Sequence, residues 1–219
     1  MYKRVLLKLS GEALKNNKAD SIIDISYLDS FANMIKKLHE EGIEIAIVVG
    51  AGNIWRGRLA ANVGLDQEKA DYMGMLGTII NAVTLSSVLN KDGLETEVFS
   101  ALSGIEKTAK KYDINAAKQA LNDKKVVFLA GGTGKPFFTT DSAAAMRAIE
   151  LNCDAILMGK NGVEGVYDKD PSKDKTAKFI KEISYDKILE LNLQVMDRYA
   201  VELLKDSNIQ TREIGRAHV

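Results

Sequence analysis

The chain has 219 residues, of which 46% are hydrophobic and 27% charged, a balance typical of soluble globular proteins. Its 30 basic residues match its 30 acidic ones, so the basic excess of a nucleic-acid-binding protein is absent and we expect no nucleic-acid partner. The single cysteine, Cys153, excludes an internal disulfide and fits a reducing cytoplasm, and the apolar runs predict no membrane span.

Short apolar runs alternate with helical patterns along the whole chain. In chain order we predict a strand at Val5–Leu9, a helix at Ile25–Leu38, a strand at Ile43–Val49, a helix at Asp66–Asn90, a strand at Thr96–Phe99, a helix at Ile114–Leu121, a strand at Val126–Ala130, a helix at Asp141–Leu151, a strand at Asp154–Met158, helices at Ser184–Leu191 and Met196–Lys205, and a last strand at Ile209–Ile214. This alternation predicts a mainly parallel α/β sheet with helices on both faces. No Pro- or Ser-rich linker divides the chain, so we expect a single domain over residues 1–219.

Three of the predicted strands run directly into loops that contain glycine. These loops are Ser10–Gly11, Gly50–Asn53 and Gly131–Gly134. In an open parallel sheet such loops share the carboxyl edge, where ligands bind. Glycine lets backbone N–H groups approach an anion closely, although tight turns need glycine as well. Three such loops at one edge predict a site for a polyphosphate ligand.

The loop at Gly131–Gly134 is followed by lysine but is not a Walker phosphate loop. That motif requires a glycine five positions before the glycine of its Gly-Lys pair, and Ser or Thr after the lysine. Leu129 and Pro136 occupy those positions here, and the proline also removes a backbone N–H. The role of this loop therefore depends on its neighbours.

Three charged residues beside the loops are candidates for contact with an anion. Lys8 lies inside an otherwise apolar strand, where a lysine is costly unless it is paired or binds an anion; the alternative is an edge strand with Lys8 in solvent. Arg56 follows Gly52 by four residues and can reach the same anion, or it is an ordinary solvated loop residue. Asp141 begins a predicted helix, where it would cap the first turn or orient the lysine.

Five stretches, taken together and in order, resemble the bacterial UMP kinases of the amino acid kinase superfamily. They are KLSGEAL (Lys8–Leu14), VVGAGNIWRG (Val48–Gly57), ADYMGMLGTIINA (Ala70–Ala82), GTGKPFFTTD (Gly132–Asp141) and GVYDKDP (Gly165–Pro171). The resemblance extends from about Tyr2 to Lys205. It implies a three-layer α/β/α sandwich, transfer of the γ-phosphate of ATP to UMP with Mg²⁺ to give UDP and ADP, and a cytoplasmic homohexamer.

The resemblance also implies which residues contact each substrate. It places ATP against Lys8, Leu9, Ser10, Gly11, Gly52, Arg56, Asn161, Tyr167 and Asp170. It places UMP against Ala51, Asp71, Thr133, Gly134, Lys135, Pro136, Phe137, Phe138, Thr139 and Thr140, with Asp71 on the ribose. Lys8, Arg56 and Asp141 would be catalytic, and Mg²⁺ would bind with the ATP phosphates rather than at a metal site of the protein. Without the resemblance, Asp71 is the acid of a helix start, and Met73, Met75 and Leu76 are core residues.

The implied reaction needs no general base, because the phosphate of UMP is already anionic at neutral pH. Catalysis would then consist of positioning and charge stabilisation on the phosphoryl group. Two other functions stay open at this point. One is another kinase of the superfamily, acting on a carbamate or an amino acid carboxylate; the other is a nucleotide-binding sensor or storage protein without turnover.

Two of the segments that depart from the pattern of the family bear on regulation and on the end of the chain. The segment KNNKADSIID (Lys15–Asp24) lacks the glycine-rich form that is linked to GTP regulation in relatives, so the sequence leaves effects of GTP and UTP open. Residues 215–219 do not resemble the family, and we expect a truncated end with residues of vector origin there.

Overall fold

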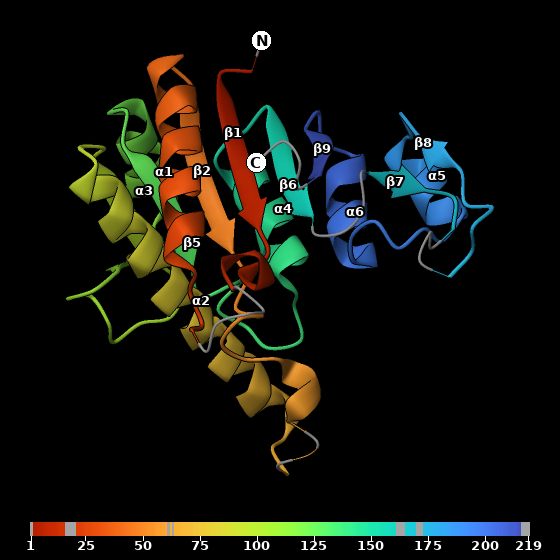
Figure 1. Ribbon diagram of the computed structural model, residues 1–219, viewed down its shortest axis with the longest axis horizontal. Helices are drawn as coiled ribbons and strands as arrows, with labels where there is room; N and C mark the ends of the chain where they lie inside the picture. The colour runs from red at the N-terminus through yellow and green to blue at the C-terminus, as the bar shows by residue number, and fades with distance from the viewer. Residues whose placement is uncertain are drawn as a thin grey trace.

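The computed structural model describes residues 2–15, 21–60, 62, 64–160, 165–169 and 173–215. Within them, seven strands form one sheet in the order β4-β3-β5-β2-β1-β6-β9, and every neighbouring pair is parallel (Figure 1). These strands are β1 (Arg4–Leu9), β2 (Glu44–Val49), β3 (Thr96–Ser100), β4 (Lys110–Lys111), β5 (Val126–Ala130), β6 (Ala155–Lys160) and β9 (Gln210–Gly215). The short strands β7 (Val166–Tyr167) and β8 (Phe179–Ile180) form a separate antiparallel pair.

Helices cover both faces of the sheet. They are α1 (Ile25–Glu40), α2 (Gln67–Lys91), α3 (Ile114–Asn122), α4 (Thr140–Glu150), α5 (Tyr185–Glu190) and α6 (Arg198–Lys205), with short 3-10 turns η1 (Gly11–Leu14) and η2 (Gly57–Leu59). The predicted three-layer α/β/α sandwich is confirmed. Sequence patterns missed β4, β7 and β8, because a strand of two residues is too short to show a period.

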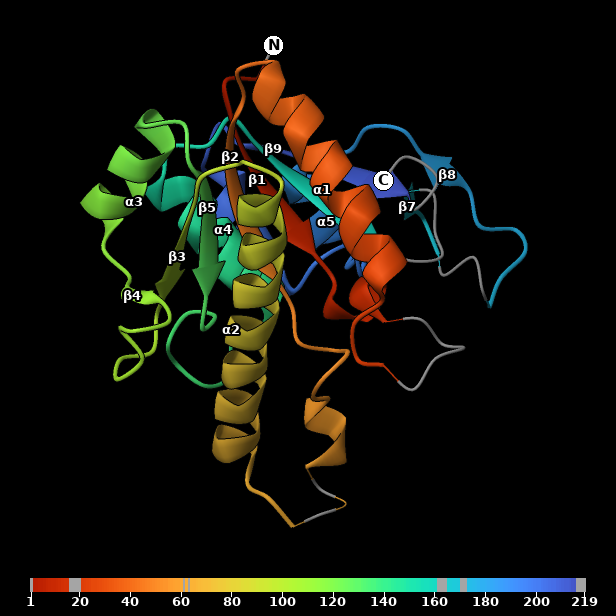
Figure 2. The ribbon, with the colours of Figure 1, turned by 60° about the vertical axis from the view of Figure 1, so that its left-hand side comes forward.

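Two apolar layers hold the helices to the sheet. Leu7 and Leu9 of β1 point to the layer of α1 and α2, which Figure 2 views from the front. Leu6 points to the opposite layer, which α3, α4, α5 and α6 cover. Because successive side chains of a strand alternate between faces, Lys8 lies on the same face as Leu6 and therefore on the side of α4. Cys153 is buried in this second layer, and burial raises the pKa of its thiol to about 12, in keeping with an inert cysteine.

Helix α2 begins beyond the carboxyl edge of the sheet and runs back along it (Figure 2). The Asp66 carboxylate caps it by accepting a hydrogen bond from Lys69 N at 2.8 Å. With 25 residues, this helix is long and apolar enough to cross a membrane by length and composition alone. Half of its most apolar 18-residue segment, however, is buried in the fold. Core helices of soluble proteins pass the same test, so this is weak evidence for a membrane span.

The exposed side of α2 corrects one expectation. Met75 is buried as predicted, but Met73 and Leu76 are not core residues, since they are 38% and 49% exposed. Ile80 on the next turn is 50% exposed as well. Met73, Leu76 and Ile80 recur at helical spacing, so they lie on one exposed side of the helix. We call these three residues the outer face of α2.

Candidate active site

The strand register brings two glycine loops to the same level. Leu9 is paired with Val49 across β1 and β2, so both strands end side by side, and Gly50 N donates to Leu9 O at 2.9 Å. A Cβ atom on Gly11 would lie 2.6 Å from Gly52 N and closer still to Gly50 O, so no other residue fits there. The loops Ser10–Gly11 and Gly50–Gly52 are therefore in direct contact, as their place at the carboxyl edge predicts.

Lys8 and Asp141 form an ion pair beside these loops. The Lys8 Nζ lies 2.7 Å from Asp141 Oδ1, and the lysine side chain is only 15% exposed. The alternative of a solvated edge lysine is wrong, because β1 lies between β2 and β6. The alternative of Asp141 as N-cap is also wrong: Thr139 Oγ1 caps α4, accepting hydrogen bonds from Asp141 N at 3.0 Å and Ser142 N at 3.2 Å. Since Asp141 lies in the first turn of α4, its carboxylate is available to orient Lys8.

Arg56 lies against the second glycine loop rather than loose in solvent. Its Nε donates to Gly52 O at 3.3 Å, and a terminal nitrogen lies 3.0 Å from the Glu12 carboxylate. An anion at the loops would find a guanidinium already held close to them. The sequence reasoning did not anticipate Glu12 as the partner of Arg56.

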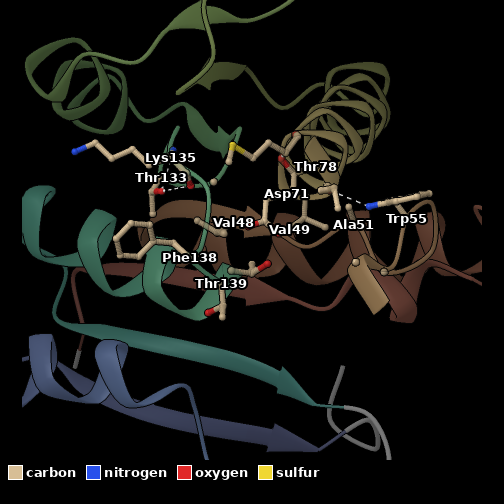
Figure 3. A pocket seen from close by; sticks show the side chains of 17 residues that line it. Val48, Val49, Ala51, Trp55, Asp71, Thr78, Thr133, Lys135, Phe138 and Thr139 are labelled. Carbon is tan, nitrogen blue, oxygen red and sulfur yellow. Dashed lines mark hydrogen bonds between the residues drawn. The ribbon is translucent and has the colours of Figure 1, made fainter. Parts of the chain in front are cut away.

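A cavity of about 280 Å³ opens next to the loops. Figure 3 shows side chains around it from β2, α2 and the segment after β5. Of the residues expected to contact UMP, those that line it are Ala51, Asp71, Thr133, Lys135, Phe138, Thr139 and Thr140, together with Gly52 from the expected ATP set. Gly134, Pro136 and Phe137 belong to the same loop but do not line the cavity. The Lys135 side chain extends away from Asp71 and Thr78 (Figure 3).

Asp71 ties helix α2 to the loop after β5. Its Oδ2 accepts a hydrogen bond from Phe137 N at 2.7 Å, and its Oδ1 accepts one from Gln67 Nε2 at 2.7 Å. The helix begins at Gln67 after the Asp66 cap, so the interpretation of Asp71 as the acid of the helix start is wrong. The carboxylate instead lies in the wall of the cavity, 66 positions from its backbone partner.

The expected contacts to the adenine end of ATP are only partly described. Tyr167 lies in the β7–β8 pair, where its ring packs edge-on against Phe179 at 5.6 Å between centroids. Asn161 and Asp170 lie outside the described residues. The assignment of these three residues to ATP stays a prediction.

Sequence reasoning missed several polar residues that support the site. Thr78, Asn81 and Asn53 are buried, and Thr78 and Trp55 line the cavity. Thr78 and Asn81 could have been found by spacing, because they follow Asp71 by seven and ten positions and so lie on the same side of the helix.

Comparison with known proteins gives one consistent family. Residues 3–212 match the model of the amino acid kinase family. The chain is 47% identical over 210 residues to the uridylate kinase of Mycoplasmopsis pulmonis (strain UAB CTIP), covering 96% of this chain and 86% of that protein. The crystal structure of UMP kinase from Ureaplasma parvum superposes with a TM-score of 0.93 at 40% identity, covering 99% of this chain and 91% of that one. The UMP kinase structure from Bacillus anthracis gives 0.93 and 40% as well, covering 98% and 87%.

Proposed function

The chain belongs to the amino acid kinase family and, within it, to the uridylate kinases, and from this premise we propose that it transfers the γ-phosphate of ATP to UMP, forming UDP and ADP. One observation carries the proposal for the residues of this chain. It is the largely buried Lys8–Asp141 ion pair, with side chains 15% and 19% exposed and 2.7 Å apart, beside two touching glycine loops and a cavity sized for a small ligand.

In the proposed reaction, a phosphate oxygen of UMP attacks the γ-phosphorus of ATP. The bond from that phosphorus to the β-γ bridging oxygen breaks, and ADP leaves. Lys8 and Arg56 would supply positive charge to the moving phosphoryl group, while backbone N–H groups of the Ser10–Gly11 and Gly50–Gly52 loops bind phosphate oxygens. Asp141 holds the Lys8 ammonium in place, so the charge needs no rearrangement when the reaction occurs.

UMP would occupy the cavity between β2, α2 and the segment Thr133–Thr140. Asp71 would accept from the ribose, and Thr139 and Thr140 stand at the N-terminus of α4, where backbone N–H groups favour a phosphate. The remaining contacts proposed from the family pattern are Ala51, Gly134, Lys135, Pro136, Phe137 and Phe138. Leu9, Tyr167, Asn161 and Asp170 complete the proposed ATP site.

Mg²⁺ is proposed to arrive with ATP. No group of three or more His, Cys, Asp or Glu side chains in the described parts of the chain could hold a metal ion. Mg²⁺ keeps several waters and commonly binds through substrate phosphates and one or two carboxylates. Asp141 and Glu12 are the acidic groups beside the loops that could contact it. Its chemistry there would be to neutralise charge on the β- and γ-phosphates.

We further propose that the chain acts as one domain in a cytoplasmic homohexamer. The outer face of α2 supports an assembly, because Met73, Leu76 and Ile80 leave a row of apolar side chains in solvent. The free, buried thiol of Cys153 fits a reducing compartment such as the cytoplasm, where disulfides are rare.

The proposal is tested by offering the purified protein ATP and Mg²⁺ with UMP, CMP, AMP or aspartate. We expect ADP to form with UMP, and UDP to appear in equal amount by chromatography. Product from aspartate instead would indicate a carboxylate kinase. Binding of ATP in calorimetry with no product from any acceptor would indicate a sensor or storage protein, and either result would contradict the proposal.

A further inference from the structure

We propose that Thr78 and Asn81 of helix α2 are positioning residues that set where the glycine loops stand relative to one another. This inference rests on the proposed function, because it treats those loops as the phosphate sites. Both residues lie inside the stretch Ala70–Ala82, but neither is among the residues that the family resemblance assigns to a substrate.

Asn81 fastens the loop that follows β2. Its Nδ2 donates to Gly50 O at 2.8 Å and to Asn53 Oδ1 at 2.8 Å. Asn53 Nδ2 donates back to Asn81 Oδ1 at 3.0 Å and to Ile22 O at 2.8 Å. Asn81 is 0% exposed, so water cannot replace these partners. Both ends of the loop Gly50–Asn53 are thus hydrogen-bonded to one amide of α2.

The position of this loop controls the position of the next one. Gly11 packs so closely on Gly50 and Gly52 that it has no room for a Cβ atom. A shift of Gly50 by a few tenths of an ångström must therefore move Gly11 as well, and with it the backbone that follows Lys8. Asn81 acts on the proposed γ-phosphate site through this contact, without touching the substrate.

Thr78 fastens the loop that follows β5. Gly131 N donates to Thr78 Oγ1 at 2.8 Å, and the same hydroxyl donates to Met75 O at 2.7 Å. Gly131 has a φ of +76°, and a Cβ atom there would lie 3.0 Å from Ala101 N and 3.1 Å from Leu102 N, so the hydrogen bond to Thr78 forms at a position that requires glycine. Asp71 makes the third contact of the same kind, to Phe137 N.

One helix face therefore holds loops from two strands. Asp71, Thr78 and Asn81 lie on a rigid helix of 25 residues, which fixes the distance between the proposed UMP loop and the proposed ATP loops. Burying polar side chains carries a desolvation cost, and their hydrogen bonds to the loops offset part of it here. A displacement of about 1 Å between reacting groups can cost on the order of 10²-fold in rate.

The test compares kcat and KM of Asn81→Leu, Thr78→Val and Thr78→Ser with those of the wild type in the UMP assay. Leu and Val keep the volume and remove the hydrogen bonds, whereas Ser keeps the hydroxyl. The control is Ser86→Ala: Ser86 is a buried polar residue of the same helix, but its hydroxyl contacts Thr96 Oγ1 at 2.6 Å and no loop of the site. Thermal unfolding of each variant separates lost stability from lost positioning.

We expect Asn81→Leu to lower kcat on the order of 10²-fold and Thr78→Val to raise KM for UMP about tenfold. Thr78→Ser should have the KM for UMP of the wild type, and Ser86→Ala should leave kcat and KM unchanged. If kcat and KM of Asn81→Leu and Thr78→Val equal those of Ser86→Ala, the inference is overturned while the proposed function stands. If Asn81→Leu does not fold, the Val and Ser variants of Thr78 decide. A wild type that forms no UDP would overturn the proposed function itself, and the inference with it, before any variant is made.

Discussion

Lys8 is the residue on which the proposed chemistry depends most. An ammonium that is 15% exposed in a central strand loses hydration, and one carboxylate at 2.7 Å offsets part of that loss. The pair is therefore poised to accept a further anion, since the lysine has three N–H donors and Asp141 satisfies only part of them. The sequence anticipated both residues, although their contact depends on the α4 layer packing on β1.

At the residue scale, Lys8→Ala should lower kcat at least ~10²-fold, as loss of one preorganised charge does in other enzymes. The measurement is steady-state UDP formation at saturating ATP and UMP. Lys36→Ala, which removes an exposed lysine of α1, is the matched control and should leave kcat unchanged. Near-normal turnover of Lys8→Ala would remove Lys8 from the catalytic role.

Helix α2 shows how one element serves two purposes. Its inner face carries Asp71, Thr78 and Asn81 to the loops, and its outer face leaves Met73, Leu76 and Ile80 in solvent. Apolar periodicity alone predicted both Met73 and Leu76 in the core. It could not tell an inner stripe from an outer one, because the segment Met73–Val83 has apolar residues on both sides of the helix and α2 projects past the sheet (Figure 2).

At the element scale, Leu76→Asp should shift the protein to smaller assemblies in sedimentation velocity, because a carboxylate buried between copies costs more than the apolar contact it replaces. Ile25→Asp is the control, since Ile25 is the most exposed large hydrophobic side chain of α1 and lies off the outer face of α2. An unchanged distribution for Leu76→Asp would exclude this face from the proposed hexamer.

At the scale of the whole molecule, a charge cluster around the buried Glu44 joins the amino ends of the strands, opposite the site. Glu44 is 3% exposed in its side chain, lies 2.8 Å from the Arg4 guanidinium and 3.2 Å from the Lys124 ammonium, and so links β1 and β2 to the turn before β5. Burial opposes ionisation of Glu44, but hydrogen bonds from Arg4 and Lys124 outweigh it and hold the pKa of the carboxyl below its usual value. A pKa lowered by folding adds stability above the unfolded value, and that stability is lost as pH falls through the folded value.

Glu44→Gln should accordingly lower the free energy of unfolding by about 3 kcal/mol near neutral pH, because it leaves the Arg4 charge without its partner. The difference in free energy of unfolding between wild type and variant should narrow as pH falls below the ordinary carboxyl range, where Glu44 is protonated in the folded and the unfolded protein. Urea unfolding at several pH values measures both effects. The control is Glu41→Gln, which removes a neighbouring exposed carboxylate and should change the free energy of unfolding little. If the destabilisation by Glu44→Gln does not depend on pH, the lowered pKa of Glu44 does not contribute to stability.

Local pattern in the sequence determined the order of strands and helices, the two-sided helical cover of a parallel sheet, and the gathering of three glycine loops at one edge. These features follow from periods of two and 3.6 residues and from the direction of parallel strands, which neighbouring residues encode. Only the tertiary structure decided that β1 is central, that Lys8 meets Asp141, and that Asp71 and Asn81 reach loops far away in the chain. The reason is that such partners are chosen by how helices pack on the sheet, and no short stretch of sequence contains both members of the pair.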